Sequence, residues 1–378
     1  MDTHSIGANT RGPALRWDVF CRVVDNLGDI GVCWRLCTDL ASRGQQVRLW
    51  IDCPDDLDWM APGARPGLHP GVQVLHWTEP MAPGLADALS PADVWVEAFG
   101  CDPARECIDA LAGRLAAGET PPVWLNLEYM SAEPWVERCH RLPSPVMSGP
   151  LKGLTKWFFY PGFTPATGGL LREATLPAQQ LAHEPARWLR NLGLPVDDGR
   201  RRVSLFCYEP EALGNVMRSA GLDASPADWL ITPGRASAAV DQALGEEPPG
   251  EGCRPVRLPR LTQQDYDRLL WSCDLNFVRG EDSLVRALWA GKPFVWQIYP
   301  QHDNAHHAKL DAFLDWLQAP PCWRAFHHGW NGMSPGETVW PGWDAIGEWA
   351  SCALQARDRL LAQADLCSQL LGFVMEKR

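Results

Sequence analysis

One stretch decides the fold of this chain: Val23-Val24-Asp25-Asn26-Leu27-Gly28-Asp29-Ile30-Gly31-Val32-Cys33-Trp34-Arg35. The apolar, β-prone residues 17–22 precede it and predict a buried strand. Residues 30–42 carry apolar side chains at helical spacing and stop before Gly44, so they predict a helix. A second strand is predicted over 47–51. Strand, glycine-containing turn, helix and strand form the opening unit of an open α/β sheet, in which ligands bind at the carboxyl ends of the strands.

The turn itself carries the first candidate site residues. Two carboxylates, Asp25 and Asp29, stand beside the glycines Gly28 and Gly31. Because the turn follows the carboxyl end of a predicted strand, we expect both aspartates to face a ligand.

Composition limits the class of protein. The 378 residues suffice for two domains, and 46% hydrophobic with 21% charged residues is typical of packed cores rather than of a disordered chain. A net charge of −12 argues against a broad nucleic-acid surface and would suit a basic partner. The 13 cysteines are scattered and include no Cys-x-x-Cys, which is typical of buried thiols in a reducing cytoplasm.

No targeting or membrane segment is expected. Residues 1–16 lack an apolar core, so they do not read as a signal peptide, and residues 1–15 are expected to be a disordered head. No apolar run approaches the roughly 18 residues of a membrane span. These features predict a cytoplasmic protein.

The remaining pattern predicts two α/β domains in tandem. We expect a first domain over 16–165, a linker region with one short helix over 166–200, and a second domain over 201–357. An aromatic run at 156–163 fits either an edge strand or a packed loop. Residues 343–375 are helical in pattern, and a helix at 358–378 is expected to pack back on the first domain. Further strands are predicted at 72–77, 94–99, 123–128, 202–206, 229–231, 256–258, 273–278 and 293–298.

A second strand-to-helix junction, Arg279-Gly280-Glu281-Asp282-Ser283, repeats the first one in the second domain. Free backbone N–H groups in the first turn of the following helix would suit a diphosphate, and the Ser283 hydroxyl can add a hydrogen bond. Glu281 and Asp282 would repel a phosphate at that place. The alternative is that the two carboxylates only stabilise the start of the helix.

Aromatic residues accompany this junction. Phe206 and Tyr208 end a strand at the same expected edge, while Gln263 and Tyr266 open the helix before the next strand. Aromatic faces there could hold a nucleobase, with Gln263 reading its edge; core packing is the alternative for each aromatic residue.

Together these motifs resemble the bacterial elongation factor P arginine rhamnosyltransferases, over nearly the whole chain after residue 16. The resemblance rests on residues 20–36, 205–209, 279–283 and 291–301, which occur in the right order. It implies an α/β GT-B glycosyltransferase with two Rossmann-like domains facing across a cleft. It also implies transfer of L-rhamnose from dTDP-β-L-rhamnose to an arginine of elongation factor P, with inversion and without a metal or other cofactor. That modification would activate the factor for rescuing ribosomes stalled at polyproline.

The resemblance also implies roles for residues. Asp25 and Asp29 match two essential aspartates of the family, and Glu281 belongs with them in catalysis. Tyr266 stands where phenylalanine is common, and Arg260 stands near an expected aromatic residue, which leaves the shape of the base pocket open. The residues implied in donor binding are Phe206, Tyr208, Gln263, Tyr266, Glu281, Asp282, Ser283 and Gly28.

The chemistry agrees with paired carboxylates. A guanidinium stays protonated and its lone pairs are delocalised, so it is a poor nucleophile. Two carboxylates can orient it, and one can accept a proton as the C–N bond forms. We take Asp29 as the general base and Asp25 as a residue that holds the acceptor or supports Asp29, although their spacing also allows the opposite assignment.

Other interpretations remain open from sequence alone. His302 and His306 have a spacing that can bind zinc on a helix, and Asp56-Leu57-Asp58 and Asp265-Tyr266-Asp267 match a short metal-binding pattern of some glycosyltransferases. The chain could also be a transferase with a different acceptor, or a non-catalytic binding module of the same fold.

Overall fold

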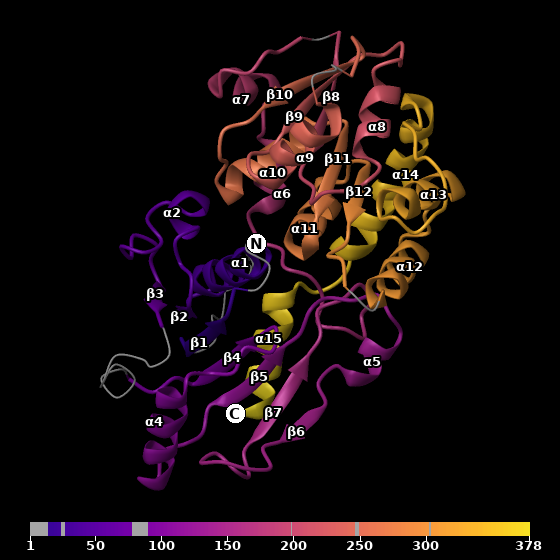
Figure 1. Cartoon of the computed structure of the whole chain (residues 1–378). Helices are drawn as coiled ribbons and strands as arrows, with labels where there is room; N and C mark the ends of the chain where they lie inside the picture. The colour runs from indigo at the N-terminus through magenta and orange to yellow at the C-terminus, as the bar shows by residue number, and fades with distance from the viewer. Residues whose placement is uncertain (1–13, 24–26, 78–89, 198, 246–248, 302–303) are drawn as a thin grey trace, which may run out of the picture.

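The computed structural model describes residues 14–23, 27–77, 90–197, 199–245, 249–301 and 304–378. Most of the expected disordered head, and Asp25, lie outside these residues. Two sheets occupy the two halves of the molecule, the first in the lower half of Figure 1 and the second in the upper half. The prediction of two α/β units is therefore confirmed.

The first sheet has seven strands in the order β3-β2-β1-β4-β5-β7-β6, parallel except for the antiparallel β6. In β1, Val19 and Cys21 face a core shared with α1, whereas Phe20 faces an aromatic core beside α4. Both faces are thus buried, which explains the continuous apolar strands. The elements are β1 Arg16–Cys21, α1 Gly28–Ser42, β2 Gln46–Ile51, α2 Leu57–Met60, β3 Val72–His76, β4 Val94–Ala98, α4 Arg105–Ala116, β5 Val123–Leu127, α5 Trp135–Cys139, β6 Pro143–Pro145 and β7 Thr155–Phe159.

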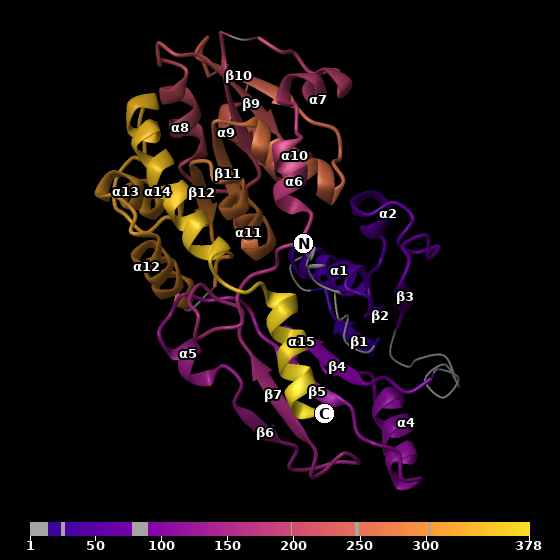
Figure 2. The ribbon, with the colours of Figure 1, turned by 180° about the vertical axis from the view of Figure 1, so that it is seen from behind.

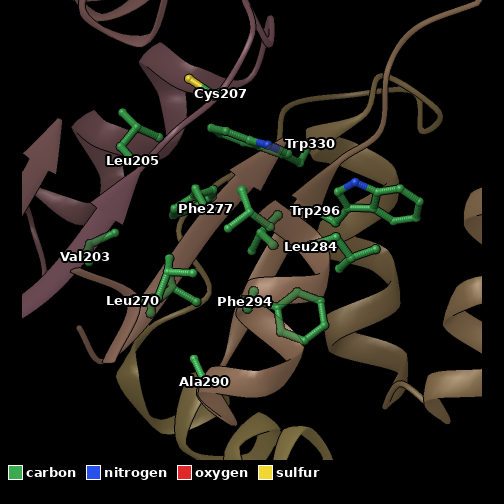
Figure 3. Packing of buried hydrophobic residues seen from close by; sticks show 14 of the residues in the cluster. Val203, Leu205, Cys207, Leu270, Phe277, Leu284, Ala290, Phe294, Trp296 and Trp330 are labelled. Atoms are coloured by element: carbon green, nitrogen blue, oxygen red, sulfur yellow. The ribbon is translucent and has the colours of Figure 1, made fainter. Parts of the chain in front are cut away.

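The second sheet has five parallel strands in the order β10-β9-β8-β11-β12. Figure 3 shows part of its core, in which Val203 and Leu205 of β8, Phe277 of β11 and Leu284 of the following helix belong to one cluster of buried residues. The elements are β8 Arg201–Leu205, α8 Leu213–Ala220, β9 Ala227–Ile231, α9 Arg235–Leu244, β10 Cys253–Arg257, α10 Gln263–Ser272, β11 Leu275–Arg279, α11 Gly280–Ala290, β12 Phe294–Gln297, α12 Ala305–Leu317 and α13 Pro321–Trp330.

Two segments join the domains. The stretch expected to hold one short helix holds two, α6 (Leu176–Leu181) and α7 (Pro185–Asn191). Later in the chain, α14 (Trp343–Leu361) packs on the second core, and α15 (Leu366–Lys377) packs on the first. Figure 2 shows α15 alongside β5 and β7. The return to the first domain thus begins at Leu366 rather than at residue 358.

The topology brings two helix starts together. The first strand of each sheet along the chain lies inside the sheet, β1 between β2 and β4 and β8 between β9 and β11. Helices α1 and α11 pack against each other. Each helix follows the carboxyl end of a strand, so the two candidate junctions lie close together where α1 meets α11.

Two expectations about composition can be checked directly. All 13 cysteines are free, and most of them are buried. Within the described part of the chain, no helix has the length and apolarity needed to cross a membrane.

Candidate active site between the domains

Two adjoining cavities lie between the domains and share Gly28, the first residue of α1. We call them the Gln263 cavity and the Lys309 cavity. The Gln263 cavity is lined by Leu27, Gly28, Arg35, Trp59, Met60, Phe206, Thr232, Pro233, Leu261, Gln263, Tyr266, Arg279, Asp282 and Ser283. The Lys309 cavity, of about 250 Å³, is lined by Gly28, Asp29, Val32, Phe99, Tyr129, Gly280, Glu281, Trp296, Ile298, Tyr299, Gln301, His306 and Lys309.

Asp29 lies in the first turn of α1, with its side chain at the Lys309 cavity. It is buried, and its carboxylate accepts a hydrogen bond of 3.2 Å from the hydroxyl of Tyr129. The Tyr129 ring in turn stacks on Phe99, with ring centroids 4.5 Å apart. Two aromatic residues from the ends of neighbouring strands therefore hold the carboxylate in place.

Glu281 reaches the same cavity from the second domain. Its carboxylate accepts a hydrogen bond of 2.9 Å from the backbone N–H of Met130 in the first domain and pairs with the Lys309 ammonium. Burial raises the pKa of Glu281 above its usual value, against the opposing effect of Lys309, and the charge of Asp29 adds to the rise. Asp29 and Glu281 thus face each other closely enough for their charges to interact.

The repulsion expected between this acidic pair and a phosphate is removed by paired cations. Asp282 lies 3.2 Å from Nε of Arg35, which comes from α1 of the other domain, and Glu281 pairs with Lys309. Both carboxylates at the start of α11 are therefore paired with a cation, one of which, Arg35, is shared with Asp267 and Glu173. The helix start remains compatible with an anion at its backbone N–H groups.

The side chain of Ser283 makes its hydrogen bonds with the backbone of Arg279, just before α11. Its hydroxyl donates to the Arg279 carbonyl and accepts from the Arg279 N–H, so it closes the first turn of α11. The hydroxyl proton is thereby committed to the protein backbone. In this arrangement the Ser283 hydroxyl does not donate the hydrogen bond to a bound anion that the sequence predicted.

Arg279 supplies the cation that the sequence analysis missed in the Gln263 cavity. Its guanidinium lies over the rings of Phe206 and Tyr208, at 4.4 and 4.6 Å from their centroids, and donates to the Cys207 carbonyl. Phe206 lines the cavity, whereas Tyr208 is buried behind Arg279 and does not line it. Tyr208 therefore supports the guanidinium rather than the ligand.

Gln263 and Tyr266 lie side by side at the start of α10. Thr262 caps this helix by accepting a hydrogen bond from the Asp265 N–H, and the Gln263 amide donates to the Gly31 carbonyl of α1 at 3.0 Å. The Tyr266 ring packs edge-on against Phe206, and its buried hydroxyl lies near Ser283 without forming a regular hydrogen bond, because the Ser283 hydroxyl is engaged by the Arg279 backbone. A ligand atom in the cavity could supply a hydrogen-bond partner for the Tyr266 hydroxyl.

Arg260 stands near a position where the family resemblance implies an aromatic residue, and the structure explains this difference. The Arg260 guanidinium lies 5.5 Å from the ring centroid of Trp59, and Trp59 lines the Gln263 cavity from the first domain. An aromatic side chain thus reaches this part of the pocket from the opposite domain. Residue spacing within the second domain could not have indicated it.

The alternative metal sites do not assemble among the described residues. His306 Nδ1 accepts from the Gln301 N–H, while His302 lies outside the described residues. Asp265 pairs with Arg268, and Asp267 pairs with Arg35 and Arg286. The described acidic groups of both short Asp-x-Asp patterns are engaged by protein donors, among them Asp58 with Arg65 and Asp56 with Trp59.

One other group of possible ligands is found in the described part of the chain, where Asp39, Asp365 and Cys367 converge. The Arg43 guanidinium pairs with both aspartates, at 2.9 and 2.7 Å. The cluster therefore joins α1 to α15 as an ion-pair network and lacks the character of a cation site.

Comparison with known proteins gives a consistent result. The sequence model of the family described as elongation factor P rhamnosyltransferase EarP matches residues 17–375. A protein-arginine rhamnosyltransferase of Pseudomonas putida is 46% identical over 316 residues, covering 79% of this chain and 80% of that protein. A protein-arginine rhamnosyltransferase of Pseudomonas aeruginosa is 40% identical over 381 residues, covering 94% of this chain and 98% of that protein.

Solved structures agree. A structure described as the basis for EarP-mediated arginine glycosylation of translation elongation factor EF-P superimposes with a TM-score of 0.62 at 29% identity, covering 96% of this chain and all (100%) of that one. The spinosyn forosaminyltransferase SpnP has a TM-score of 0.50 at 13% identity, with 96% of this chain and 100% of that one covered, and shows the fold alone. The GT-B fold expected from the sequence is confirmed.

Proposed function

This chain belongs to the elongation factor P rhamnosyltransferase family, and from that premise we propose that it transfers L-rhamnose from dTDP-β-L-rhamnose to one arginine of elongation factor P. The transfer would invert the anomeric centre and need no metal. We propose that it takes place in the cytoplasm, where a translation factor works, and that it activates the factor for rescue of ribosomes stalled at polyproline.

One observation carries the proposal. Asp29 of the first domain and Glu281 of the second face a single cavity, and that cavity adjoins the Gln263 cavity at Gly28. A nucleotide held in the Gln263 cavity would therefore place its sugar next to two carboxylates. A cationic acceptor side chain suits those carboxylates, and a guanidinium can bind them with directed N–H groups.

The donor would be held mainly by the second domain. Phe206, Tyr266 and Trp59 offer aromatic faces for the base, and Gln263 offers an amide for its edge. The Arg279 guanidinium and the free N–H groups at the start of α11 offer positive charge for the diphosphate. As the C1–O bond to the β-phosphate breaks, its electron pair goes to the leaving dTDP, which this charge stabilises.

The acceptor would be activated by carboxylates. Asp29 and Glu281 hold the guanidinium so that one nitrogen points at C1, and the C–N bond forms on the face opposite the leaving group. Asp29 takes the proton that this nitrogen loses. Asp25, which lies outside the described residues, is proposed to orient the acceptor or Asp29.

Intact mass spectrometry tests the proposal. Purified elongation factor P incubated with this protein and dTDP-L-rhamnose should gain one deoxyhexose, and the same factor with its target arginine replaced by lysine should gain none. Binding of dTDP-rhamnose without any gain would indicate a transferase with another acceptor. Neither binding nor gain would leave a non-catalytic binding module.

The Tyr266 hydroxyl gives a sharper test of donor placement. Because it is buried without a regular hydrogen bond among the described residues, we expect Tyr266→Phe to raise the donor KM about fivefold to tenfold. The unfolding temperature of the free enzyme should stay the same or rise slightly, since an unsatisfied buried hydroxyl is removed. Tyr160→Phe, away from both cavities, is the control. An unchanged donor KM in Tyr266→Phe would contradict this placement.

Independence from metal is tested by chelation. Arg279 and the α11 start offer the positive charge that a divalent ion supplies in other transferases, so we expect EDTA to leave initial rates unchanged. A loss of turnover in EDTA that a divalent ion restores would overturn the proposal.

A further inference from the structure

Arg35 is a first-domain side chain that ends in the second domain. It extends from α1, only 6% of its side chain is exposed, and its guanidinium binds both carboxylate oxygens of Asp267 at 3.0 and 3.1 Å. The same group donates to the Gln263 carbonyl at 3.2 Å and lies 3.2 Å from Asp282. One guanidinium thus holds the starts of both α10 and α11.

A second arginine completes the network from the other side. Arg286 of α11 binds both oxygens of Asp267 at 2.8 Å and also pairs with Glu173, a residue of the segment between the domains. Arg35 reaches Glu173 as well, at 3.2 Å. Burial favours the neutral form of Glu173, but Arg286 and Arg35 outweigh it and lower its pKa to about 2. Glu173 is therefore held as a carboxylate between the two guanidinium groups, whereas burial raises the pKa of Asp282 against the opposing effect of Arg35.

This network borders the proposed donor site. Arg35, Gln263 and Asp282 all line the Gln263 cavity, and the Gln263 amide is held by the carbonyl of Gly31, one helical turn before Arg35 on α1. The same helix carries Asp29 in its first turn. The distance between the proposed base and the donor-binding residues is thus fixed by contacts along a single face of α1.

We propose that Arg35 is a positioning residue that sets the donor site against the catalytic helix and cancels the charge of Asp282 beside the donor's diphosphate. This inference rests on the proposed function. Without the guanidinium, Asp282 would direct an uncompensated negative charge into the cavity, and α1 would lose its attachment to α10 and α11. Arg35 itself touches neither reacting atom in this scheme.

The experiment measures dTDP affinity by calorimetry, and donor KM and kcat in the rhamnosyl-transfer assay. We expect Arg35→Met to weaken dTDP binding and raise the donor KM at least about tenfold. Because that variant leaves buried carboxylates unpaired, which destabilises the fold, Arg35→Lys is made beside it. Lysine keeps the charge without the fork geometry, so its dTDP affinity should fall between those of Arg35→Met and the wild type.

Arg43→Met is the matched control. Arg43 follows the last residue of the same helix and also links it to a distant element, through Asp365 near the start of α15, but it lines neither cavity. We expect it to lower the unfolding temperature while dTDP affinity stays at the wild-type value. If the Arg35 variants behave like Arg43→Met, their role is structural only and the inference is overturned.

Rescue tests the electrostatic part. Asp282→Asn should restore dTDP affinity to Arg35→Met, because the charge that Arg35 cancels is then absent; the double variant should bind within about threefold of Asp282→Asn alone. If Asp282→Asn does not restore dTDP affinity to Arg35→Met, the electrostatic part of the inference is overturned. A wild-type protein that binds no dTDP would refute the proposed function and this inference together, whereas normal dTDP binding by both Arg35 variants would refute the inference alone.

Discussion

Replacing Asp29 by asparagine should reduce kcat for rhamnosyl transfer about a hundredfold to ten-thousandfold, the range expected for loss of a general base. Asparagine has the size of aspartate and can still accept the hydrogen bond from Tyr129, so the turn and its aromatic support should persist. The carboxamide cannot take the acceptor's proton. Binding of dTDP, which involves the adjoining cavity, should therefore be unchanged.

Asp39→Asn is the control for this prediction. It removes another buried carboxylate from α1, one that pairs with Arg43 away from both cavities. Its turnover per folded enzyme should equal that of the wild type. Near-normal turnover in Asp29→Asn would contradict our assignment, and if Asp25→Asn then proved inactive, the roles of the two aspartates would be exchanged.

Replacing Glu281 by glutamine should lower kcat about a hundredfold and raise the KM for elongation factor P. The amide oxygen can keep the hydrogen bond from the Met130 N–H, but the charge facing Asp29 across the cavity is lost. The Lys309 ammonium then lacks its partner and repels the incoming guanidinium. Steady-state kinetics with varied acceptor concentration separates the two effects.

Two further variants sharpen this prediction. In Glu281→Gln with Lys309→Met, the acceptor KM should recover while kcat stays low, because the repelling cation is gone and the catalytic carboxylate is still missing. Glu128→Gln is the charge control: this half-buried carboxylate neighbours Glu281 in a third cavity and lines neither part of the proposed site. Acceptor kcat/KM within a few-fold of the wild type in Glu281→Gln would refute a catalytic role for Glu281.

Local pattern was enough to predict most of the architecture. Apolar strands buried on both faces, each next to a glycine or a helix, predict parallel sheets, and both junctions carrying the candidate carboxylates were located from such strands. The aromatic run after residue 155, which fitted either an edge strand or a loop, forms β7. It pairs with β5 on one side and with the edge strand β6 on the other. Helix α9 was not predicted because the residues that it buries on one face, Ala236, Ala239 and Val240, are small.

The site was predicted less completely, because its charges are paired across domains. Sequence indicated Glu281 and Asp282 but not the cations that neutralise them, since Lys309 comes from α12 and Arg35 from α1. The signal available for Arg35 was its spacing: Gly28, Gly31 and Arg35 recur on one helical face. Which residues lie opposite that face depends on how the two domains pack against each other, and a local sequence pattern does not indicate this packing.

The return of α15 to the first sheet has a consequence for how the protein is made. Leu366, Leu370 and Phe373 fill the core beside α1, yet they are translated after the entire second domain. At the usual pace of synthesis, the acceptor-side domain waits on the order of tens of seconds with this apolar face uncovered. During that interval the nascent chain exposes apolar surface of the kind that chaperones bind. The domain that bears Asp29 reaches its final form only after the whole second domain has been synthesised.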